Sequence, residues 1–335
     1  MKAMVLEKCG PVHEGSLVLR EVPDPVPGPG EVLLEISACG VCRTDLHILE
    51  GDLDLPRLPL IPGHQIVGRV AAMGPETKGR FRPGERVGLP WLHQTCGTCE
   101  FCREGRENLC ENALFTGFHR DGGYAEKTKA PEDFLYRLPQ GISDLQAAPL
   151  LCAGIIGHRA LKISGIQPGG RLGIYGFGAS AHVALQIAVH RGCSCYVVSR
   201  TPSHRELAAR LGAVWTGGPG ERPPEPPHSS VVFAPAGPVV LQAMEHLRPG
   251  GTCALAGVTM TPIPEMDYEK HLFHERVLRS VTAATREDGE SHLAEAARAG
   301  VRTEIQVFSL EEADRALMLL KESRIDGAAV LRIRP

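Results

Sequence analysis

The sequence predicts an α/β protein with two domains, a β-rich first half followed by a doubly wound parallel sheet. Length is one reason, because 335 residues exceed the roughly 250 to 300 at which a single hydrophobic core stops growing. The pattern of apolar residues is the other. Short apolar runs between Gly and Pro fill the first half, whereas strand-like and helix-like segments alternate in the second, as in βαβ units around a parallel sheet.

Strand patterns dominate the first 150 residues, and no helical periodicity competes with them. The runs are rich in β-branched residues and end at Gly or Pro, which interrupt regular structure. We therefore expect strands at 31–38, 65–74, 85–92 and 123–130.

After about Pro149, each strand-like run is followed by an amphipathic segment of helical length. The proline-rich stretch 218–230 interrupts this alternation and has the composition of a surface loop. We expect strands at 169–178, 194–199, 229–237 and 251–258, and helices at 180–192, 203–213 and 238–247.

The last part of the chain is expected to return to the first domain. From about Arg279 a strand pattern precedes helical patterns at 288–300 and 311–325 and a strand pattern at 327–333. The predicted organisation is a first domain of residues 1–150, a second domain of 151–285, and a returning segment of 286–335.

Composition excludes several classes of partner. The formal net charge is −3, and no block of Lys or Arg is long enough to follow nucleic-acid phosphates or an anionic membrane. The first residues, MKAMVLEKCG, contain no apolar signal region, and no apolar run reaches the roughly 18 residues of a membrane span. We expect a cytoplasmic protein whose partner is a small molecule, with no nucleic acid and no membrane.

Four of the eleven cysteines share one polar loop, with the spacing C-x2-C-x2-C-x7-C. Because eleven is an odd number and the compartment is expected to be reducing, metal ligation is favoured over a disulfide framework. Four thiolates complete the tetrahedral coordination of Zn²⁺ and leave no position for substrate. The loop is therefore expected to hold a structural zinc, with redox-active or unpaired thiols as the alternative. Its ligands are Cys96, Cys99, Cys102 and Cys110.

The second half contains a dinucleotide-binding pattern between an expected strand and an expected helix. Gly176, Gly178 and Ala181 fit G-x-G-x-x-A. Glycine at the first two positions allows a tight turn and a close approach of the backbone to a pyrophosphate, and a small third residue allows helix and strand to pack. Glycines that merely end a strand are the alternative. A nicotinamide cofactor is the leading candidate.

Three further stretches identify the family that the chain resembles: CGVCRTDLHILEGD at 39–52, IPGHQIVG at 61–68 and APLLCAGIIGHRAL at 148–161. With the four-cysteine loop, DGGYAE, the glycine turn and FAPAG, they occur in the order found in the zinc-dependent medium-chain alcohol dehydrogenases. The resemblance covers essentially the whole chain. It implies a GroES-like catalytic domain, which is the β-rich half, and a Rossmann domain for the cofactor.

The resemblance assigns a catalytic zinc to Cys42, His64 and Cys152. Two thiolates and one imidazole balance the charge of Zn²⁺ and leave a fourth position open, as a catalytic site requires. Cys39 competes with Cys42 but does not directly precede the RTD motif, so it is expected to be a small buried residue. For Cys152 the alternative is an inert buried thiol.

The same resemblance supplies the roles around this zinc. Asp45 is expected to accept the other ring N–H of His64 and so to fix its tautomer. The Thr44 hydroxyl is expected to hydrogen-bond the substrate oxygen, and His47 to continue a proton relay through the cofactor ribose to solvent. Alternatively, Thr44 and His47 only cap and cover a turn.

Substrate binding is less well defined by the sequence. Leu53 and Trp91 align with substrate-pocket positions of the family and suggest an apolar pocket for a primary alcohol or aldehyde, although both are equally compatible with the core. Gln65 stands where the family usually has glutamate. A neutral amide leaves the site more positive, which predicts a stronger Lewis acid.

The expected cofactor contacts are Arg43 at the pyrophosphate, Arg286, and the end of the second strand of the glycine-turn domain. Enzymes that prefer NAD place Asp or Glu about 20 residues after the glycine turn, and Ser199 occupies that position here. Arg200 follows, with Thr201 and Arg205 nearby, and a guanidinium suits a 2′-phosphate. NADP(H) is therefore slightly favoured over NAD(H).

These residues together predict a zinc-dependent alcohol dehydrogenase or aldehyde reductase with two Zn²⁺ per chain. A polyol dehydrogenase is the alternative enzyme, although that branch typically has glutamate where Cys152 stands. A non-catalytic, redox-responsive zinc protein is the alternative outside enzymes. By resemblance, a homotetramer is expected, with a dimer second.

Overall fold

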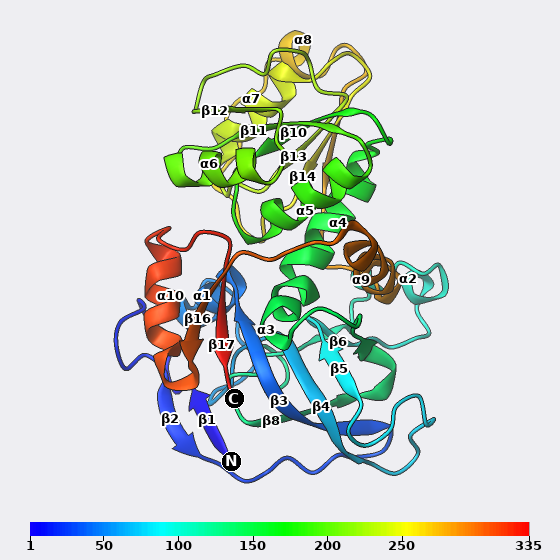
Figure 1. The fold of residues 1–335 in the computed structure, drawn as a ribbon, viewed down its shortest axis with the longest axis vertical. Coiled ribbons are helices and arrows are strands. Elements are labelled where there is room, and N and C mark those ends of the chain that lie inside the picture. The colour runs from blue at the N-terminus through cyan, green and yellow to red at the C-terminus, as the bar shows by residue number, and fades with distance from the viewer. Residues whose placement is uncertain (335) are drawn as a thin grey trace. The chain divides into compact units, whose positions relative to one another are not determined.

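The computed structural model describes residues 1–334 and divides the chain into two units (Figure 1). The first unit comprises Met1–Cys152, Ala283–Leu293 and the segment that begins at Thr303. The second comprises Ala153–Thr282 and Ala294–Arg302. Helix α9 (Arg286–Ala299) is divided between them. None of the helices formed by residues 1–334 has both the length and the apolar character to cross a membrane.

The first unit is built on a seven-stranded sheet in the order β16-β17-β3-β4-β5-β9, with β8 also paired to β3. Strand β3 lies at the centre of this sheet. Its burial pattern fits that position, because every second side chain is buried along its first residues and all side chains are buried at its end. Pairing is antiparallel except between β16 and β17. The strands are β3 (Glu31–Val41), β4 (Gln65–Met73), β5 (Arg86–Leu89), β8 (Lys127–Pro131), β9 (Tyr136–Arg137), β16 (Ile305–Ser309) and β17 (Ala328–Arg332).

Smaller elements complete this unit. Two small antiparallel sheets are formed by β1 (Lys2–Val5) with β2 (Val18–Glu21) and by β6 (Leu92–Gln94) with β7 (Leu114–Phe115). Helices α1 (Arg43–Glu50) and α10 (Ala313–Lys321) pack together. The short helices are α2 (Glu100–Arg103), α3 (Asp144–Ala147), η1 (Glu107–Leu109), η2 (Glu132–Phe134), η3 (Ala148–Leu151) and η4 (Leu310–Glu312).

The second unit contains a six-stranded parallel sheet in the order β12-β11-β10-β13-β14-β15. The chain winds outward from β10 to β12, then starts again beside β10 and winds the other way, so the order reverses between β10 and β13. Ligands of such sheets bind beyond the carboxyl ends of the strands at this reversal. The strands are β10 (Arg171–Tyr175), β11 (Ser194–Val198), β12 (Trp215–Gly217), β13 (Ser229–Val232), β14 (Thr252–Leu255) and β15 (Val277–Ser280). The helices are α4 (Ala153–Ser164), α5 (Ala179–His190), α6 (Pro202–Arg210), α7 (Gly237–His246) and α8 (Tyr268–His271).

The predicted fold class is confirmed, with differences in single elements. The run 85–92, expected as one strand, is two strands that end and begin on either side of Pro90, which has no N–H for a ladder. The strand expected at 123–130 begins only at Lys127, because Gly123 and Tyr124 instead hydrogen-bond to the carbonyls of Gly63 and Pro62. Strand β16 was not predicted.

Candidate functional site

Cys42, His64 and Cys152 converge in the first unit, with their potential ligand atoms all within 4.8 Å of one another. Cys42 directly follows β3 and His64 directly precedes β4. Gly40 is paired with Gln65 in the β3–β4 ladder. Cys42 and His64 therefore meet at one end of that strand pair. Helix η3 packs against both strands and ends beside Cys152.

These residues fit a metal ion. His64 is 0% exposed, and its Nε2 atom has no hydrogen-bond partner, although a buried polar atom normally has one. Burial alone would lower the pKa of His64, but Asp45 and Cys42 raise it to about 10. Hydrogen bonding from Cys152 and contact with His64 hold the pKa of Cys42 well below its usual range despite burial. The pocket therefore favours positive charge, and three ligands leave one position of a tetrahedron open.

Asp45 is the fixed centre around which these ligands are arranged. Its Oδ1 accepts hydrogen bonds from His64 Nδ1 at 2.9 Å and from the Gly63 N–H at 3.2 Å. Its Oδ2 accepts from the Cys42 N–H at 2.8 Å, as the third residue of α1 in a capping box. Because Nδ1 of His64 donates to a carboxylate, Nε2 presents its lone pair as the ligand atom.

Tyr124 is a fourth donor to Asp45 and received no role from the sequence. Its hydroxyl donates to Asp45 Oδ2 at 3.2 Å, and the side chain is fully buried. A Cβ on Gly63 would lie 2.4 Å from Tyr124 Cδ1, so glycine is required there for the ring to approach. The signal was available in DGGYAE, since a buried tyrosine hydroxyl needs a polar partner.

Thr44 and His47 lie three residues apart on α1, a spacing that places them on one helix face. Thr44 is buried, and its Oγ1 is 3.7 Å from Cys42 Sγ. The Nδ1 atom of His47 is 2.7 Å from Asp52 Oδ2. Arg43, expected at the pyrophosphate, donates to the carbonyl oxygen of Leu320 at 3.2 Å, at the end of α10.

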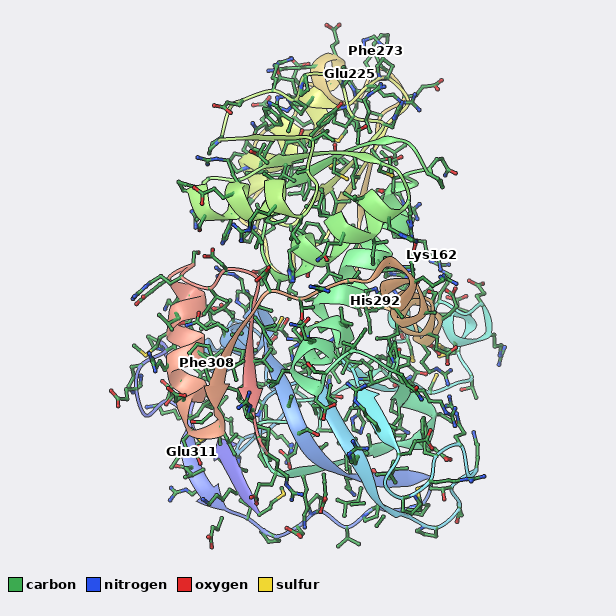
Figure 2. The ribbon with its side chains drawn as sticks, in the orientation of Figure 1. Lys162, Glu225, Phe273, His292, Phe308 and Glu311 are labelled. Carbon is green, nitrogen blue, oxygen red and sulfur yellow. The ribbon has the colours of Figure 1, made fainter. Side chains whose placement is uncertain are left out.

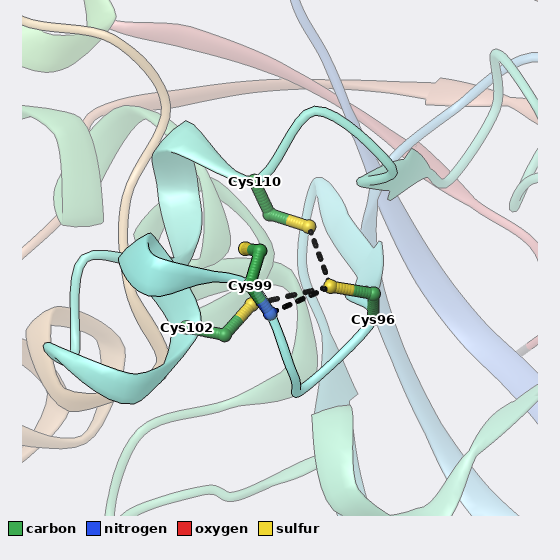
Figure 3. Close-up of side chains that lie close together, drawn as sticks. All are labelled: Cys96, Cys99, Cys102 and Cys110. Carbon is green, nitrogen blue, oxygen red and sulfur yellow. Dashed lines mark hydrogen bonds between the residues drawn. The ribbon is translucent and has the colours of Figure 1, made fainter.

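The four cysteines of the 95–110 loop form a second cluster (Figure 3). Their sulfur atoms lie within 4.8 Å of one another, including pairs of 3.6 Å between Cys110 and Cys96 and 3.9 Å between Cys96 and Cys102. Backbone hydrogen bonds from Thr98 and Cys99 lower the pKa of Cys96 to about 6, which favours a thiolate. Four sulfur donors at this separation fit a closed tetrahedral zinc site.

Arg286 helps to anchor this loop, through a contact that the sequence did not reveal. Its Nη2 is 2.6 Å from Oε2 of the buried Glu107, and its backbone N–H donates to Glu107 Oε1 at 2.8 Å. The guanidinium carbon also lies 4.7 Å from the ring centroid of Phe134. The structure thus places Arg286 in an ion pair within the first unit, and its expected cofactor contact stays a prediction.

Aromatic side chains border the first cluster. Trp91 meets the ring of His64 edge-on at 4.9 Å between centroids and stacks on Phe115 at 4.8 Å. Leu53 packs against the core of the unit.

Gln65 is buried, and its Oε1 has no hydrogen-bond partner. Cys39 is fully buried in the core and is outside the ligand cluster, as expected.

The glycine turn of the second unit has the geometry that a dinucleotide requires. Gly176 has φ +85°, and a Cβ there would lie 2.7 Å from the backbone nitrogen of Ala234. Gly178 is the N-cap of α5, and a Cβ there would meet nothing within 4 Å, so its surface is open to a pyrophosphate at the helix N-terminus. Ala181 is fully buried.

At the end of β11, Ser199 is buried and Arg200 is exposed. Arg205 braces this turn from α6, because its Nη1 donates to the carbonyl oxygens of Ser199 at 2.7 Å and Arg200 at 3.3 Å. The turn carries no carboxylate at the position that would repel a 2′-phosphate.

Comparison with known proteins gives consistent results. Residues 28–140 match the Alcohol dehydrogenase GroES-like domain family, and residues 179–298 match the Zinc-binding dehydrogenase family. The probable alcohol dehydrogenase AdhA of Mycobacterium tuberculosis is 47% identical over 99% of this chain and 97% of its own.

Two solved structures are similar over the whole chain. Acetophenone reductase from Geotrichum candidum in complex with NAD has a TM-score of 0.88 at 26% identity and covers 99% of this chain and 97% of its own. A zinc-binding dehydrogenase from Sinorhizobium meliloti bound to NADP has a TM-score of 0.87 at 25% identity, with 99% of both chains covered.

Proposed function

Because the chain belongs to the zinc-dependent alcohol dehydrogenases of the medium-chain dehydrogenase/reductase superfamily, and is an oxidoreductase that acts on alcohols, we propose which residues perform each step. Cys42, His64 and Cys152 would hold the catalytic zinc, and Cys96, Cys99, Cys102 and Cys110 a structural one. The single observation that supports the catalytic site best is the buried, unpartnered Nε2 of His64 beside two thiols.

Zinc and the nicotinamide would each supply one part of the chemistry. A zinc ion held by these ligands would supply Lewis acidity toward the oxygen of an alcohol or a carbonyl. A nicotinamide held at the glycine turn of Gly176 and Gly178 would supply the hydride acceptor or donor. Asp45 keeps the His64 ring in the orientation and tautomer for ligation, and Tyr124 and the Cys42 N–H keep Asp45 in place.

Thr44 and His47 handle the proton. The Thr44 hydroxyl, buried beside Cys42, would accept the proton of the alcohol while passing its own toward His47. A neutral imidazole is suited to receive this proton, because the ordinary pKa of a histidine side chain lies near physiological pH. The Thr44–His47 spacing on one face of α1 supports this order.

We propose a small, largely apolar primary alcohol or its aldehyde as substrate. The wall formed by Trp91 beside His64 supports an apolar pocket, and Cys152 in place of a glutamate argues against the polyol branch. A panel of primary alcohols, secondary alcohols and polyols tests this assignment. The highest kcat/KM on a polyol would overturn it.

For the cofactor, we propose that NADP(H) is preferred over NAD(H), because Ser199 removes the repelling carboxylate and Arg200 is exposed beside it. Arg200→Ala is expected to reduce kcat/KM for NADP(H) about tenfold, the effect of losing one charged hydrogen-bond donor to a phosphate, and to leave NAD(H) nearly unchanged. Steady-state kinetics with both cofactors measure this. A wild-type preference for NAD(H), or an unchanged NADP(H) efficiency in the variant, would contradict the assignment.

We propose a homotetramer, with a dimer as the second possibility. In the described part of the chain, β15 is an edge strand of the six-stranded sheet, and large apolar side chains are exposed near it. Phe273, labelled in Figure 2, is 58% exposed and Tyr268 is 62% exposed. An exposed edge with apolar neighbours is suited to pairing with a second chain. Sedimentation velocity of the zinc-loaded protein is expected to show no monomer at micromolar concentration.

A further inference from the structure

The chain that follows the C-terminus of α1 places the carboxylate of Asp52 beside the ring of His47. Gly51 adopts the left-handed conformation, with φ +81°, which glycine does without strain. Its N–H donates to the carbonyl oxygen of His47 at 3.1 Å, and the next N–H, that of Asp52, donates to the same oxygen at 3.0 Å. The chain therefore turns back over the last turn of the helix.

This turn brings the Asp52 side chain to the His47 ring. Asp52 Oδ2 lies 2.7 Å from His47 Nδ1, so Asp52 contacts His47 through both its backbone and its side chain. The His47 side chain is 17% exposed, whereas the Asp52 side chain is 51% exposed. The pair thus extends from a mostly buried imidazole to a carboxylate in contact with solvent.

We propose that Asp52 is the positioning residue of the proton relay. It holds the neutral His47 ring with the hydrogen on Nδ1, so that Nε2 is the nitrogen that accepts the proton. The resulting imidazolium then lies beside a carboxylate, which stabilises its charge until water takes the proton. Only a proton moves along Thr44, His47 and water, and no bond other than those to hydrogen changes. The inference rests on the relay role proposed for His47.

The other charged groups of the two packed helices do not compete with Asp52 for this role, because each has a contact of its own. Arg43 donates to Leu320 and Ser323, and Asp45 serves His64. The remaining contacts are Glu50 with Lys321, Asp314 with the N–H groups of Gly15 and Leu17, and Arg315 with Glu312. Asp52 is therefore the carboxylate that the geometry assigns to the His47 ring.

Asp52→Asn tests the proposal because the amide keeps a hydrogen-bond acceptor and removes only the charge. A carboxylate partner favours the protonated ring, so its loss is expected to move the acid limb of kcat/KM for alcohol oxidation to lower pH. A weaker base also transfers protons less readily, so the rate at high pH is expected to fall several-fold. Asp54→Asn is the matched control, since Asp54 is an exposed carboxylate two residues along the same loop, and it should reproduce the wild-type profile.

A spectroscopic measurement separates positioning from a structural role. In the zinc-loaded protein labelled with ¹⁵N-histidine, the His47 signals, assigned from their loss in His47→Gln, should show the Nδ1–H tautomer and a titration midpoint that Asp52→Asn lowers. If His47→Gln leaves the pH profile unchanged, the relay itself is wrong. If His47→Gln abolishes the limb while Asp52→Asn matches Asp54→Asn in both profile and midpoint, the relay stands and the role of Asp52 is overturned.

Discussion

Cys152→Ser is expected to lower kcat/KM for alcohol oxidation by about a thousandfold or more while the fold remains intact. The variant removes one of three ligands that leave a coordination position open, and a Lewis acid at such a site supplies several kcal/mol of transition-state stabilisation. Because Cys152 lies at the end of η3, where Leu150 and Leu151 are fully buried, apolar packing holds the local backbone without the metal. The melting temperature should therefore change by less than about 2 °C.

Metal analysis accompanies the kinetics. Wild-type protein is expected to contain two zinc ions per chain, and Cys152→Ser close to one. The matched control is Cys39→Ala, which alters a fully buried thiol outside the ligand cluster and should retain both ions and most of the activity. One zinc or none in freshly purified wild-type protein, or substantial turnover by Cys152→Ser, would show that this cluster is not the catalytic site.

Local patterns predicted the fold and the four-cysteine cluster well, because their causes are local. The G-x-G-x-x-A turn needs glycine at Gly176, where φ is positive and a Cβ would collide with Ala234, and such a requirement is visible in the sequence. The 95–110 cysteines are close in space because they are close in the chain. The zinc assignment to Cys42, His64 and Cys152 instead depended on family resemblance, since nothing in the spacing of three distant residues reveals the β3–β4 register that joins two of them.

The contacts that the sequence did not reveal are long-range pairs of charged or polar groups. Glu107 and Arg286 are 179 positions apart, and Tyr124 and Asp45 are 79 apart. No local motif joins the two members of either pair, and an isolated charge in a sequence is usually a solvated one. The contact between His47 and Asp52 is short-range, but it depends on the left-handed turn at Gly51. It therefore became evident only from the structure of the C-terminus of α1.

The second large effect is on stability. Cys99→Ser is expected to lower the free energy of unfolding by at least about 3 kcal/mol, because structural zinc binding is coupled directly to folding, and the melting temperature by at least about 4 °C. The loop has few other means of support, since α2 has no buried residue. The small apolar cluster beneath it is Leu92, Cys110, Ala113 and Phe134, one of which is itself a ligand.

Cys9→Ser is the control for this variant, because Cys9 is also partly buried and lies outside both clusters. It should keep two zinc ions and the wild-type melting temperature. Cys99→Ser should contain one zinc, should dissociate more readily in sedimentation experiments, and should retain the activity of whatever fraction stays folded at low temperature. Two tightly bound zinc ions in Cys99→Ser would exclude Cys99 as a ligand.

The position of Glu107 within the same loop extends this prediction to α9. Arg286, the first residue of α9, uses its backbone N–H and its guanidinium on Glu107, so a loop released by zinc loss also removes the acceptor at the start of that helix. Faster amide hydrogen exchange is therefore expected at 286–293 in Cys99→Ser and not in Cys152→Ser. Equal protection of this segment in both variants would show that the ion pair holds without the metal, and that the structural zinc supports the loop alone.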